Sequence, residues 1–275
     1  MSEFLELRRG DAPLIVSFPH TGTDVPSALE PRFASPWIAR KDADHWVHLL
    51  YDFAQELGAT TLRTRLSRSV IDVNRDPSGA SLYPGQNTTE LCPLATFDGE
   101  ALYARGQEPT PDEIAERRSA YFDPYHAALR AELERLQSKA PRVVVYDAHS
   151  IRSRVPRLFQ GELPVLNIGT FDGKSCAAEL SNAVERCCAL DARFSHVLNG
   201  RFRGGWITRH YGAPARGVHA VQMELACRGY LVEPESFTPD NWPPPYAAGR
   251  AAGLQTVLRA VLQACLDFAR NRSSP

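Results

Sequence analysis

Residues 142–150 read RVVVYDAHS, an apolar run that ends in an aspartate, a histidine and a serine. A strand that is apolar along nearly its whole length is typically buried on both faces of a sheet, as in parallel sheets covered by helices. Comparable β-rich runs elsewhere in the chain predict further strands. They occupy residues 14–18, 59–67, 69–74, 163–170 and 219–225.

Helical patterns lie between several of these runs. We expect helices over residues 43–57 and about 246–270, where apolar side chains recur at helical spacing, and over residues 111–138, which open with a proline and two acidic residues. Pro124 should kink or divide the segment 111–138. The alternation of strands and helices predicts an α/β fold with a mixed, mostly parallel sheet covered by helices on both faces.

The composition fits a single domain over residues 1–275. A formal net charge of -1 gives no overall attraction to nucleic acid or to an anionic membrane, so the expected partner is a small molecule. No apolar run is long enough to span a bilayer, and the first residues lack the pattern of a secretory signal, which favours the cytoplasm. The segment 76–110 is rich in proline and glycine and long for a connection, and it is a candidate active-site lid.

Two histidines stand where apolar runs end. His20 follows LIVSFP and His149 follows RVVVYDA, and in open α/β sheets ligands bind beyond the carboxyl ends of the strands. With Asp24 in the loop after His20, they supply two imidazoles and one carboxylate, which leaves the fourth position of a tetrahedral zinc ion open. Asp147 would orient His149 from behind. A histidine that only satisfies local hydrogen bonds is the alternative at each position.

A third candidate position follows the run SVIDVN. Asn74 and Arg75 stand side by side there, with Arg68 upstream. A guanidinium group binds a carboxylate through two parallel hydrogen bonds, and a neighbouring asparagine completes the contact. These residues are therefore candidates for binding a substrate carboxylate, and an ion pair with Asp72 or Asp76 is the alternative.

Glu224 lies inside the apolar run HAVQMEL. Burying an unpaired carboxylate is costly, so such a glutamate either pairs with a cation or has a chemical role. A general base beside the open zinc position is one such role. An ion pair with Arg228 or another buried arginine is the alternative.

Further arginines gather in two segments, one directly after His149 and one in the glycine-rich stretch 196–214. The single RGG run in that stretch is weak evidence for RNA binding in a chain without net positive charge. A glycine-rich loop that brings arginines onto an anionic substrate is the better interpretation. The candidates for substrate contact are Arg152, Arg154, Arg201, Arg203 and Arg209.

Taken together, these motifs closely resemble those of the N-formylglutamate amidohydrolases, the deformylases of bacterial histidine degradation. The resemblance spans nearly the whole chain. It is carried by SFPHTGTDVP, DADHWVHLLYDFAQELGA, SRSVIDVNRDP, YDAHSIRSRVPRLFQGELP, NIGTFDGKSC, SHVLNGRFRGGWITRHYG and HAVQMELACRGY.

The resemblance implies a fold related to the zinc-dependent exopeptidases (phosphorylase/hydrolase-like) and a zinc amidohydrolase that cleaves N-formyl-L-glutamate, a small dicarboxylate amide, to formate and L-glutamate. In zinc carboxypeptidases a metal histidine with a nearby carboxylate, an arginine, an Asn-Arg pair, a second metal histidine and a late catalytic glutamate follow one another along the chain. The corresponding residues here are His20 with Asp24, Arg68, Asn74 and Arg75, His149 and Glu224.

This resemblance also implies roles for single residues. Glu224 takes a proton from a zinc-activated water and returns it to the leaving amine, and Arg68 assists carboxylate binding or stabilises the tetrahedral oxyanion. Asp44, in the stretch DADHW, is an alternative metal ligand or an outer partner of the metal site. It ranks behind Asp24, because Asp24 shares a loop with His20.

Other classes of function remain as alternatives. The nearest is a zinc hydrolase of another N-acyl or N-carbamoyl amino acid. A metal-free hydrolase with Ser150 or Cys227 as nucleophile is a second, although the chain has no GxSxG motif. A non-catalytic anion-binding protein is the third.

Overall fold

A computed structural model describes residues 3–81, 85 and 88–270 of the chain. Seven strands in this part form one sheet, which comprises, in sheet order, β1 (Leu5–Arg8), β3 (Thr60–Thr64), β2 (Leu14–Phe18), β4 (Val143–Ile151), β7 (Val218–Ala226), β5 (Leu166–Gly169) and β6 (His196–Leu198). The pairs β1–β3 and β5–β7 are antiparallel, and the other four neighbouring pairs are parallel. The prediction of a mixed, mostly parallel sheet is confirmed.

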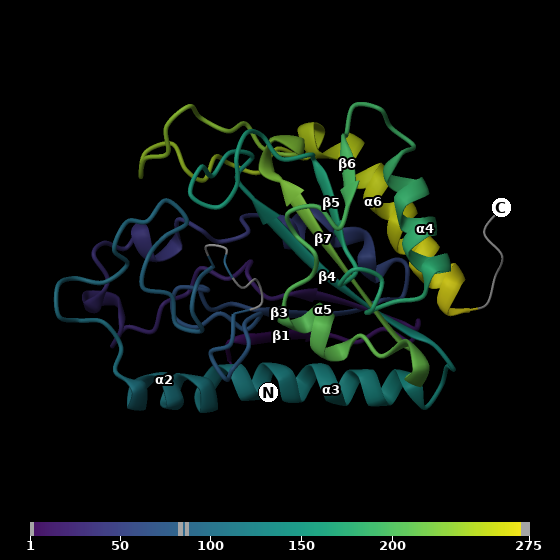
Figure 1. Cartoon of the computed structure of the whole chain (residues 1–275), viewed down its shortest axis with the longest axis horizontal. Coiled ribbons are helices and arrows are strands. Elements are labelled where there is room, and N and C mark those ends of the chain that lie inside the picture. Colours follow the sequence, from purple (N-terminus) through teal and green to yellow (C-terminus); the bar gives the residue numbers. More distant parts are fainter. Residues whose placement is uncertain (1–2, 82–84, 86–87, 271–275) are drawn as a thin grey trace.

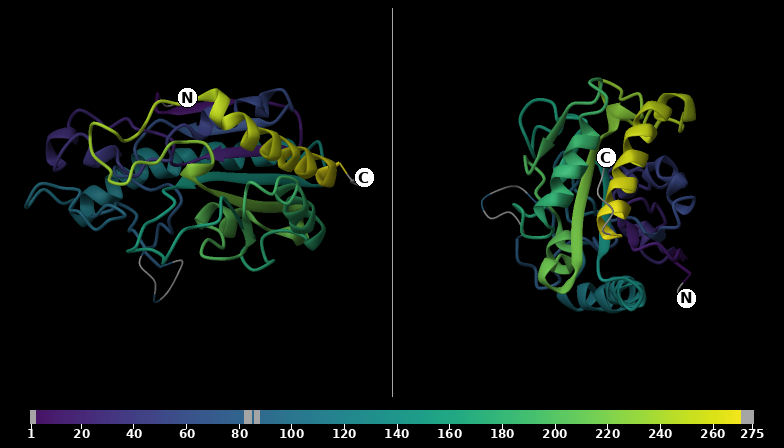
Figure 2. Two further views of the ribbon diagram at one scale, coloured as in Figure 1. Left: turned by 90° about the horizontal axis from the view of Figure 1, so that it is seen from above. Right: turned by 90° about the vertical axis from the view of Figure 1, so that its right-hand side faces the viewer.

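Helices pack against both faces of this sheet, as the sequence predicts. Apolar side chains of α1 (Val47–Leu50), α4 (Ala178–Cys188) and α6 (Ala248–Ala269) form a core with one face. Those of α3 (Asp123–Gln137) and α5 (Trp206–Tyr211) form a second core with the other face (Figure 1). Two further views show α6 and α3 on different sides of the strands (Figure 2). No helix in the described residues is long and apolar enough to cross a membrane.

The helical segment expected over residues 111–138 is divided, as Pro124 predicts. Helix α2 (Pro111–Arg117) begins with a capping box in which Thr110 and Glu113 bind each other's backbone N–H groups. A π-helical turn covers Arg118–Phe122, and α3 begins directly after it. Proline has no N–H to donate within a helix, so the regular ladder of hydrogen bonds is interrupted in the turn before it.

The prediction of one helix over residues 43–57 is wrong. The first residues of this segment are not helical, and the rest forms two short helical pieces instead of one helix. Only α1 and a 3-10 turn, Asp52–Gln55, are helical. Trp46 adopts a left-handed backbone with φ of 65° immediately before α1, which no residue inside a right-handed helix can do. The residues before Trp46 therefore form a loop.

The strand predicted over residues 69–74 is also wrong, because this buried segment is a loop. Its backbone groups do not join a ladder. The N–H of Asp72 donates to the carbonyl of Leu91, and the N–H of Asn74 donates to the Asp72 carboxylate. An apolar and buried sequence thus mimics a strand here without pairing as one.

The candidate lid, residues 76–110, is irregular where the structure describes it, and residues 82–84 and 86–87 lie outside the described residues. Thr88 and Thr89 of this segment line the cavity of the candidate site. Closure of the segment over a ligand stays a prediction.

Candidate active site

The central strands β4 and β7 place four polar side chains next to one another. Their parallel register pairs Asp147 with Gln222 and His149 with Glu224. Side chains alternate between the two faces of a strand, so these four project from the same face. All four are buried, and His149 and Glu224 lie toward the carboxyl ends of their strands, where ligands bind in open α/β sheets.

His20, Asp44 and His149 form a compact group of potential metal ligands. One ligand atom of each lies within 4.8 Å of those of the other two. Asp44 Oδ2 is 3.1 Å from His149 Nδ1 and 3.7 Å from His20 Nδ1. The structure thus brings together the two histidines that the sequence places at strand ends, and all three side chains are buried.

Asp24, the carboxylate that the sequence favours as third ligand, lies outside this group. Its side chain is half exposed and forms an ion pair of 3.0 Å with Arg65. The cause is its backbone, because the N–H of Asp24 donates to the carbonyl of Arg65 and Asp24 forms a bridge with Leu66. This bridge continues the parallel pairing of β2 with β3 beyond the two strands, and the Asp24 side chain pairs there with Arg65 instead of joining the two histidines. Asp44, the alternative ligand, occupies the place expected for Asp24.

Asp44 reaches the group from the loop that precedes α1. Its N–H donates to the carbonyl of His20 at 2.9 Å, and its Oδ2 accepts the N–H of Ser150 at 3.1 Å. The left-handed backbone of Trp46 then turns the chain into α1. The interruption of the expected helix therefore fixes a carboxylate between two imidazole rings.

A second carboxylate lies behind each imidazole. Asp72 Oδ1 is 2.7 Å from His20 Nε2, and Asp147 Oδ2 is 2.9 Å from His149 Nε2. Such contacts orient a ligating imidazole and increase its basicity. The carboxylates of Asp72 and Asp147 thus contact the Nε2 atoms of the two histidines, whereas both Nδ1 atoms face Asp44.

The group fits a divalent cation. Among the residues that the structure describes, His20 Nδ1 and Asp44 Oδ1 are buried without a hydrogen-bond partner, which is unusual unless a ligand satisfies them. Imidazole nitrogens and a carboxylate oxygen are donors that zinc binds in proteins. Burial acts to lower the pKa of His149, but Asp147 and Asp44 together raise it well above its usual range. The surroundings of these side chains therefore favour positive charge.

Asp72 also joins the histidine group to two arginines. Its Oδ2 accepts a hydrogen bond from Arg68 Nη2 at 2.6 Å and lies 3.5 Å from Arg75 Nη2. Burial acts to raise the pKa of Asp72, but Arg75, His20 and Arg68 hold it well below its usual range. Arg75 also donates to the carbonyl and hydroxyl oxygens of Thr89. The ion pair between Arg75 and Asp72, one alternative from the sequence, is present.

Asn74 borders the cavity, but both ends of its amide contact protein groups. Nδ2 donates to Asp147 Oδ2 at 3.0 Å and lies 2.9 Å from His149 Nε2. Oδ1 accepts the N–H of Ile207 at 2.7 Å. The structure therefore places Asn74 behind His149 and at the start of α5, whereas the sequence suggests a contact with a substrate carboxylate.

Glu224 is a buried carboxyl group next to the histidine group. Burial raises its pKa to about 8, although His149 and Arg68 act to lower it. Arg228, its alternative ion-pair partner, instead lies 3.3 Å from Glu162. A carboxyl group with a pKa near neutrality is suited to accept a proton and to return it.

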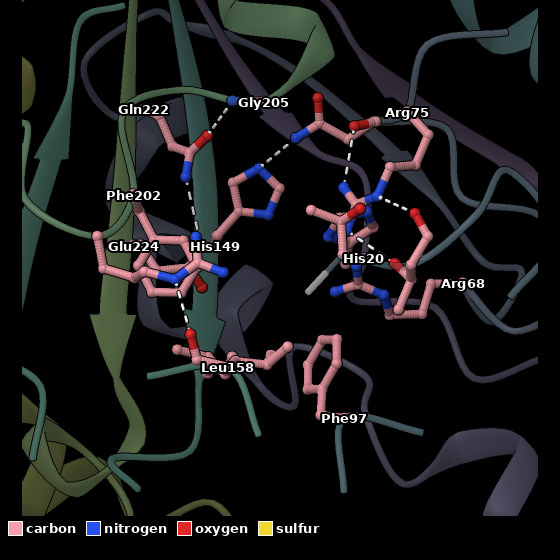
Figure 3. A pocket seen from close by; sticks show the side chains of 15 residues that line it. His20, Arg68, Arg75, Phe97, His149, Leu158, Phe202, Gly205, Gln222 and Glu224 are labelled. Atoms are coloured by element: carbon pink, nitrogen blue, oxygen red, sulfur yellow. Dashed lines mark hydrogen bonds between the residues drawn. The ribbon is translucent and has the colours of Figure 1, made fainter. Parts of the chain in front are cut away.

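A small cavity of about 70 Å³ joins these groups (Figure 3). His20, His149 and Glu224 form part of its wall. Positive and apolar side chains complete the wall, so the cavity suits an anion that also has an aliphatic part. They include Arg68, Arg75, Arg201, Phe97 and Leu158.

The other arginines expected to contact a substrate are not among the described residues that line this cavity. Arg152 is buried in ion pairs with two aspartates. Arg154 and Arg203 are exposed and each is paired with an acidic side chain. Arg209 donates to the carbonyl of Gly204. Of these five candidate arginines, only Arg201 is among the described residues that line the cavity.

The two candidate nucleophiles of a metal-free mechanism are likewise absent from the described lining of the cavity. Ser150 Oγ accepts a hydrogen bond from the Tyr230 hydroxyl at 2.8 Å. Burial raises the pKa of the Cys227 thiol, so its reactive thiolate form is disfavoured. The geometry does not support nucleophilic catalysis by either side chain.

Comparison with known proteins identifies the family. The model of the family described as N-formylglutamate amidohydrolase matches residues 12–231. The chain belongs to the N-formylglutamate amidohydrolase family. Two relatives named N-formylglutamate deformylase, from Pseudomonas putida and Pseudomonas aeruginosa, are each 42% identical to this amidohydrolase over 272 residues, which is 99% of both chains.

Solved structures share the fold of this amidohydrolase. The crystal structure of N-formylglutamate amidohydrolase from Ralstonia eutropha JMP134 matches with a TM-score of 0.79 and 22% identity, over 97% of this chain and 98% of that one. The gene product Atu2144 from Agrobacterium tumefaciens matches with a TM-score of 0.71 and 17% identity, over 98% and 97%. These comparisons confirm the family and the α/β class that the sequence predicts. Membership of the family also confirms the prediction of a hydrolase that acts on amide bonds.

Two buried residues of the amidohydrolase site, Asp72 and Gln222, are missing from the set of site residues that the sequence suggests. From the sequence, Asp72 is expected only as an ion-pair partner of Arg75. Gln222 precedes Glu224 by two positions in the same strand, so strand alternation alone puts both side chains on one face. That spacing is the signal by which Gln222 can be found from sequence.

Proposed function

We propose that this amidohydrolase cleaves N-formyl-L-glutamate to formate and L-glutamate, a reaction of histidine degradation, with one bound zinc ion. The names of two relatives that are 42% identical over 99% of the chain support the substrate. The observation that carries the mechanism is that His20, His149 and Glu224 face the same cavity as three arginines.

His20, Asp44 and His149 are the residues that would hold the zinc ion. When bound there, zinc polarises a carbonyl group and lowers the pKa of water toward about 7. Asp72 and Asp147 keep the two imidazole rings oriented through their Nε2 atoms. Asp24, exposed and paired with Arg65, takes no part in this proposal.

Glu224 acts as the general base. It removes a proton from the water that attacks the formyl carbon, and it delivers that proton to the nitrogen of the departing glutamate. Burial raises its pKa to about 8, and a divalent cation held by the adjacent histidine group would lower it and so favour the carboxylate form that accepts the proton.

The arginines of the cavity wall recognise the anionic groups. Arg75 and Arg201 bind the two carboxylates of the substrate, because a guanidinium matches a carboxylate through paired hydrogen bonds. Arg68 Nη1 lies 3.6 Å from Asp44 Oδ1, beside the proposed metal ligands, and Arg68 stabilises the negative charge that develops on the formyl oxygen when water adds to the formyl carbon. The ring of Phe97, 4.8 Å from the Arg68 guanidinium, packs against that side chain.

The test is formate release from N-formyl-L-glutamate by metal-stripped protein, before and after zinc is restored, with N-acetyl-L-glutamate and N-carbamoyl-L-glutamate run beside it. We expect formate only after zinc is restored, and no comparable turnover of the other two compounds. Full activity in a strong chelator would contradict the metal site. Preferred cleavage of the carbamoyl or acetyl compound would show that N-formyl-L-glutamate is not the preferred substrate. Binding of N-formyl-L-glutamate without formate release would indicate an anion-binding protein.

A further inference from the structure

The side chain of Gln222 connects a loop to the carboxylate of Glu224. Its Oε1 accepts the N–H of Gly205 at 2.6 Å, and its Nε2 donates to Glu224 Oε2 at 3.3 Å (Figure 3). Gln222 is 3% exposed and Glu224 is 8% exposed. Solvent therefore has little access to replace either hydrogen bond.

The contact with Gly205 decides which way the Gln222 amide points. A backbone N–H can only donate, so the side-chain atom 2.6 Å away is the amide oxygen. The amide nitrogen, which can only donate, then faces Glu224. A fixed donor next to a carboxylate restricts the orientation of that carboxylate and stabilises its ionised form.

Missing side chains at two glycines allow this arrangement. Gly169 faces Gln222 in the antiparallel pair of β5 and β7, and a Cβ on Gly169 would lie 2.6 Å from the nitrogen of Gly204. A Cβ on Gly205 would lie 2.5 Å from the Asn74 amide. The loop backbone therefore lies directly against β5 and presents its N–H to Gln222 at a defined position.

We propose that Gln222 is a positioning residue for the reaction. Its amide, oriented by the Gly205 N–H, holds the Glu224 carboxylate in the orientation in which it exchanges a proton with water and with the leaving amine. The inference rests on the proposed role of Glu224 as general base. The loop that orients Gln222 also carries Arg201, so a substrate contact and the base are attached to the same short segment.

A double-mutant cycle between Gln222 and Glu224 tests the proposal, with kcat for N-formyl-L-glutamate, zinc content and thermal unfolding measured for each variant. Gln222→Met keeps a similar volume and removes both hydrogen bonds. We expect it to lower kcat about 10- to 100-fold in the wild-type background and less than about twofold in the Glu224→Gln background, because Gln222 acts through Glu224. Zinc content should not change.

Gln222→Glu is the second variant, because it preserves the shape of the side chain and the acceptor for Gly205. Its other oxygen would repel the Glu224 carboxylate or share a proton with it, so kcat should fall by a similar factor. Equal fractional losses in both Glu224 backgrounds would overturn the proposal, and so would wild-type kcat for Gln222→Glu. Failure of the proposed function is visible separately: wild-type protein would release no formate, or Glu224→Gln alone would keep its kcat.

Discussion

Asp44 Oδ2 lies 3.1 Å from His149 Nδ1, although the two residues are 105 positions apart in the chain. The same carboxylate accepts the N–H of Ser150, the residue that follows His149. The loop before α1 is thereby attached to the end of β4 at the position where the ligand atoms meet. This contact distinguishes Asp44 from Asp24, which is close to His20 in sequence but is half exposed, paired with Arg65 and not part of the group.

The first prediction concerns the third metal ligand. Asp44→Asn should weaken zinc binding about 100-fold or more, because it removes a negatively charged donor from the set. Asp24→Asn is the matched control and should leave zinc affinity unchanged, since Asp24 pairs with Arg65 at the surface. Competition with a chromophoric chelator measures both dissociation constants. If both substitutions weakened zinc binding equally, Asp24 would have to be counted as a metal ligand.

The second prediction concerns the base. Glu224→Gln keeps the shape of the side chain and removes the group that accepts a proton. We expect kcat to fall about 10²- to 10⁴-fold, while zinc content and the folded state stay as in the wild type. Steady-state formate release, metal analysis and thermal unfolding measure these three quantities. A kcat near that of the wild type would exclude Glu224 from proton transfer.

The third prediction separates two neighbouring arginines. Arg201→Ala should raise KM for N-formyl-L-glutamate about 10- to 100-fold, because a charge-assisted contact is lost. Arg203→Ala should leave KM unchanged, since Arg203 is exposed and lies 3.4 Å from Asp172. Steady-state kinetics of both variants give the comparison.

A second substrate identifies the carboxylate that Arg201 binds. N-formyl-L-glutamine lacks the side-chain carboxylate, so a wild-type preference for the glutamate compound that disappears in Arg201→Ala assigns Arg201 to that group. A preference that survives the substitution would assign Arg201 to the α-carboxylate.

The fourth prediction concerns stability at acidic pH. His126 Nε2 lies 2.8 Å from the carbonyl of Val73, and its Nδ1 lies 2.9 Å from the Tyr211 hydroxyl. Burial lowers the pKa of His126 to about 4. Between pH 6.5 and 4 the unfolded chain binds a proton that the native state does not, so the free energy of unfolding falls as the pH decreases through this range.

At pH 5 this histidine should cost about 2 kcal/mol of stability relative to pH 7. Urea unfolding at the two pH values measures the loss. His126→Gln should reduce the difference between them by about that amount, whereas a difference that does not change would show that His126 is not the group responsible. Burial also lowers the pKa of His45 to about 4, so that residue contributes with the same sign.

Much of this arrangement can be predicted from the sequence, because it depends on local periodicity. The apolar runs that become β2, β4 and β7 end near His20, His149 and Glu224, and parallel strands bring their carboxyl ends to one edge of a sheet. Each of these side chains is placed by its own strand. No knowledge of a distant contact is needed to expect them in one site.

Asp44 and the segment 69–74 could not be placed in this way. The position of Asp44 depends on a hydrogen bond from its backbone to His20 and on the left-handed backbone of Trp46, and both are tertiary effects. The segment 69–74 is apolar because it is buried, but its N–H groups bind the Leu91 carbonyl and the Asp72 carboxylate instead of a neighbouring strand. A buried loop and a buried strand can therefore have the same apolar sequence pattern.

The register of β4 and β7 has a consequence for recognising distant relatives. Asp147 and His149, and Gln222 and Glu224, are each two residues apart, and the pairs stand opposite each other in adjacent strands. Insertion of one residue within either strand would turn its pair to the opposite face of the sheet, whereas insertions in the connection between the strands leave the geometry intact. A search that keeps both two-residue spacings fixed and lets the distance between the pairs vary freely should therefore detect divergent members that overall identity misses.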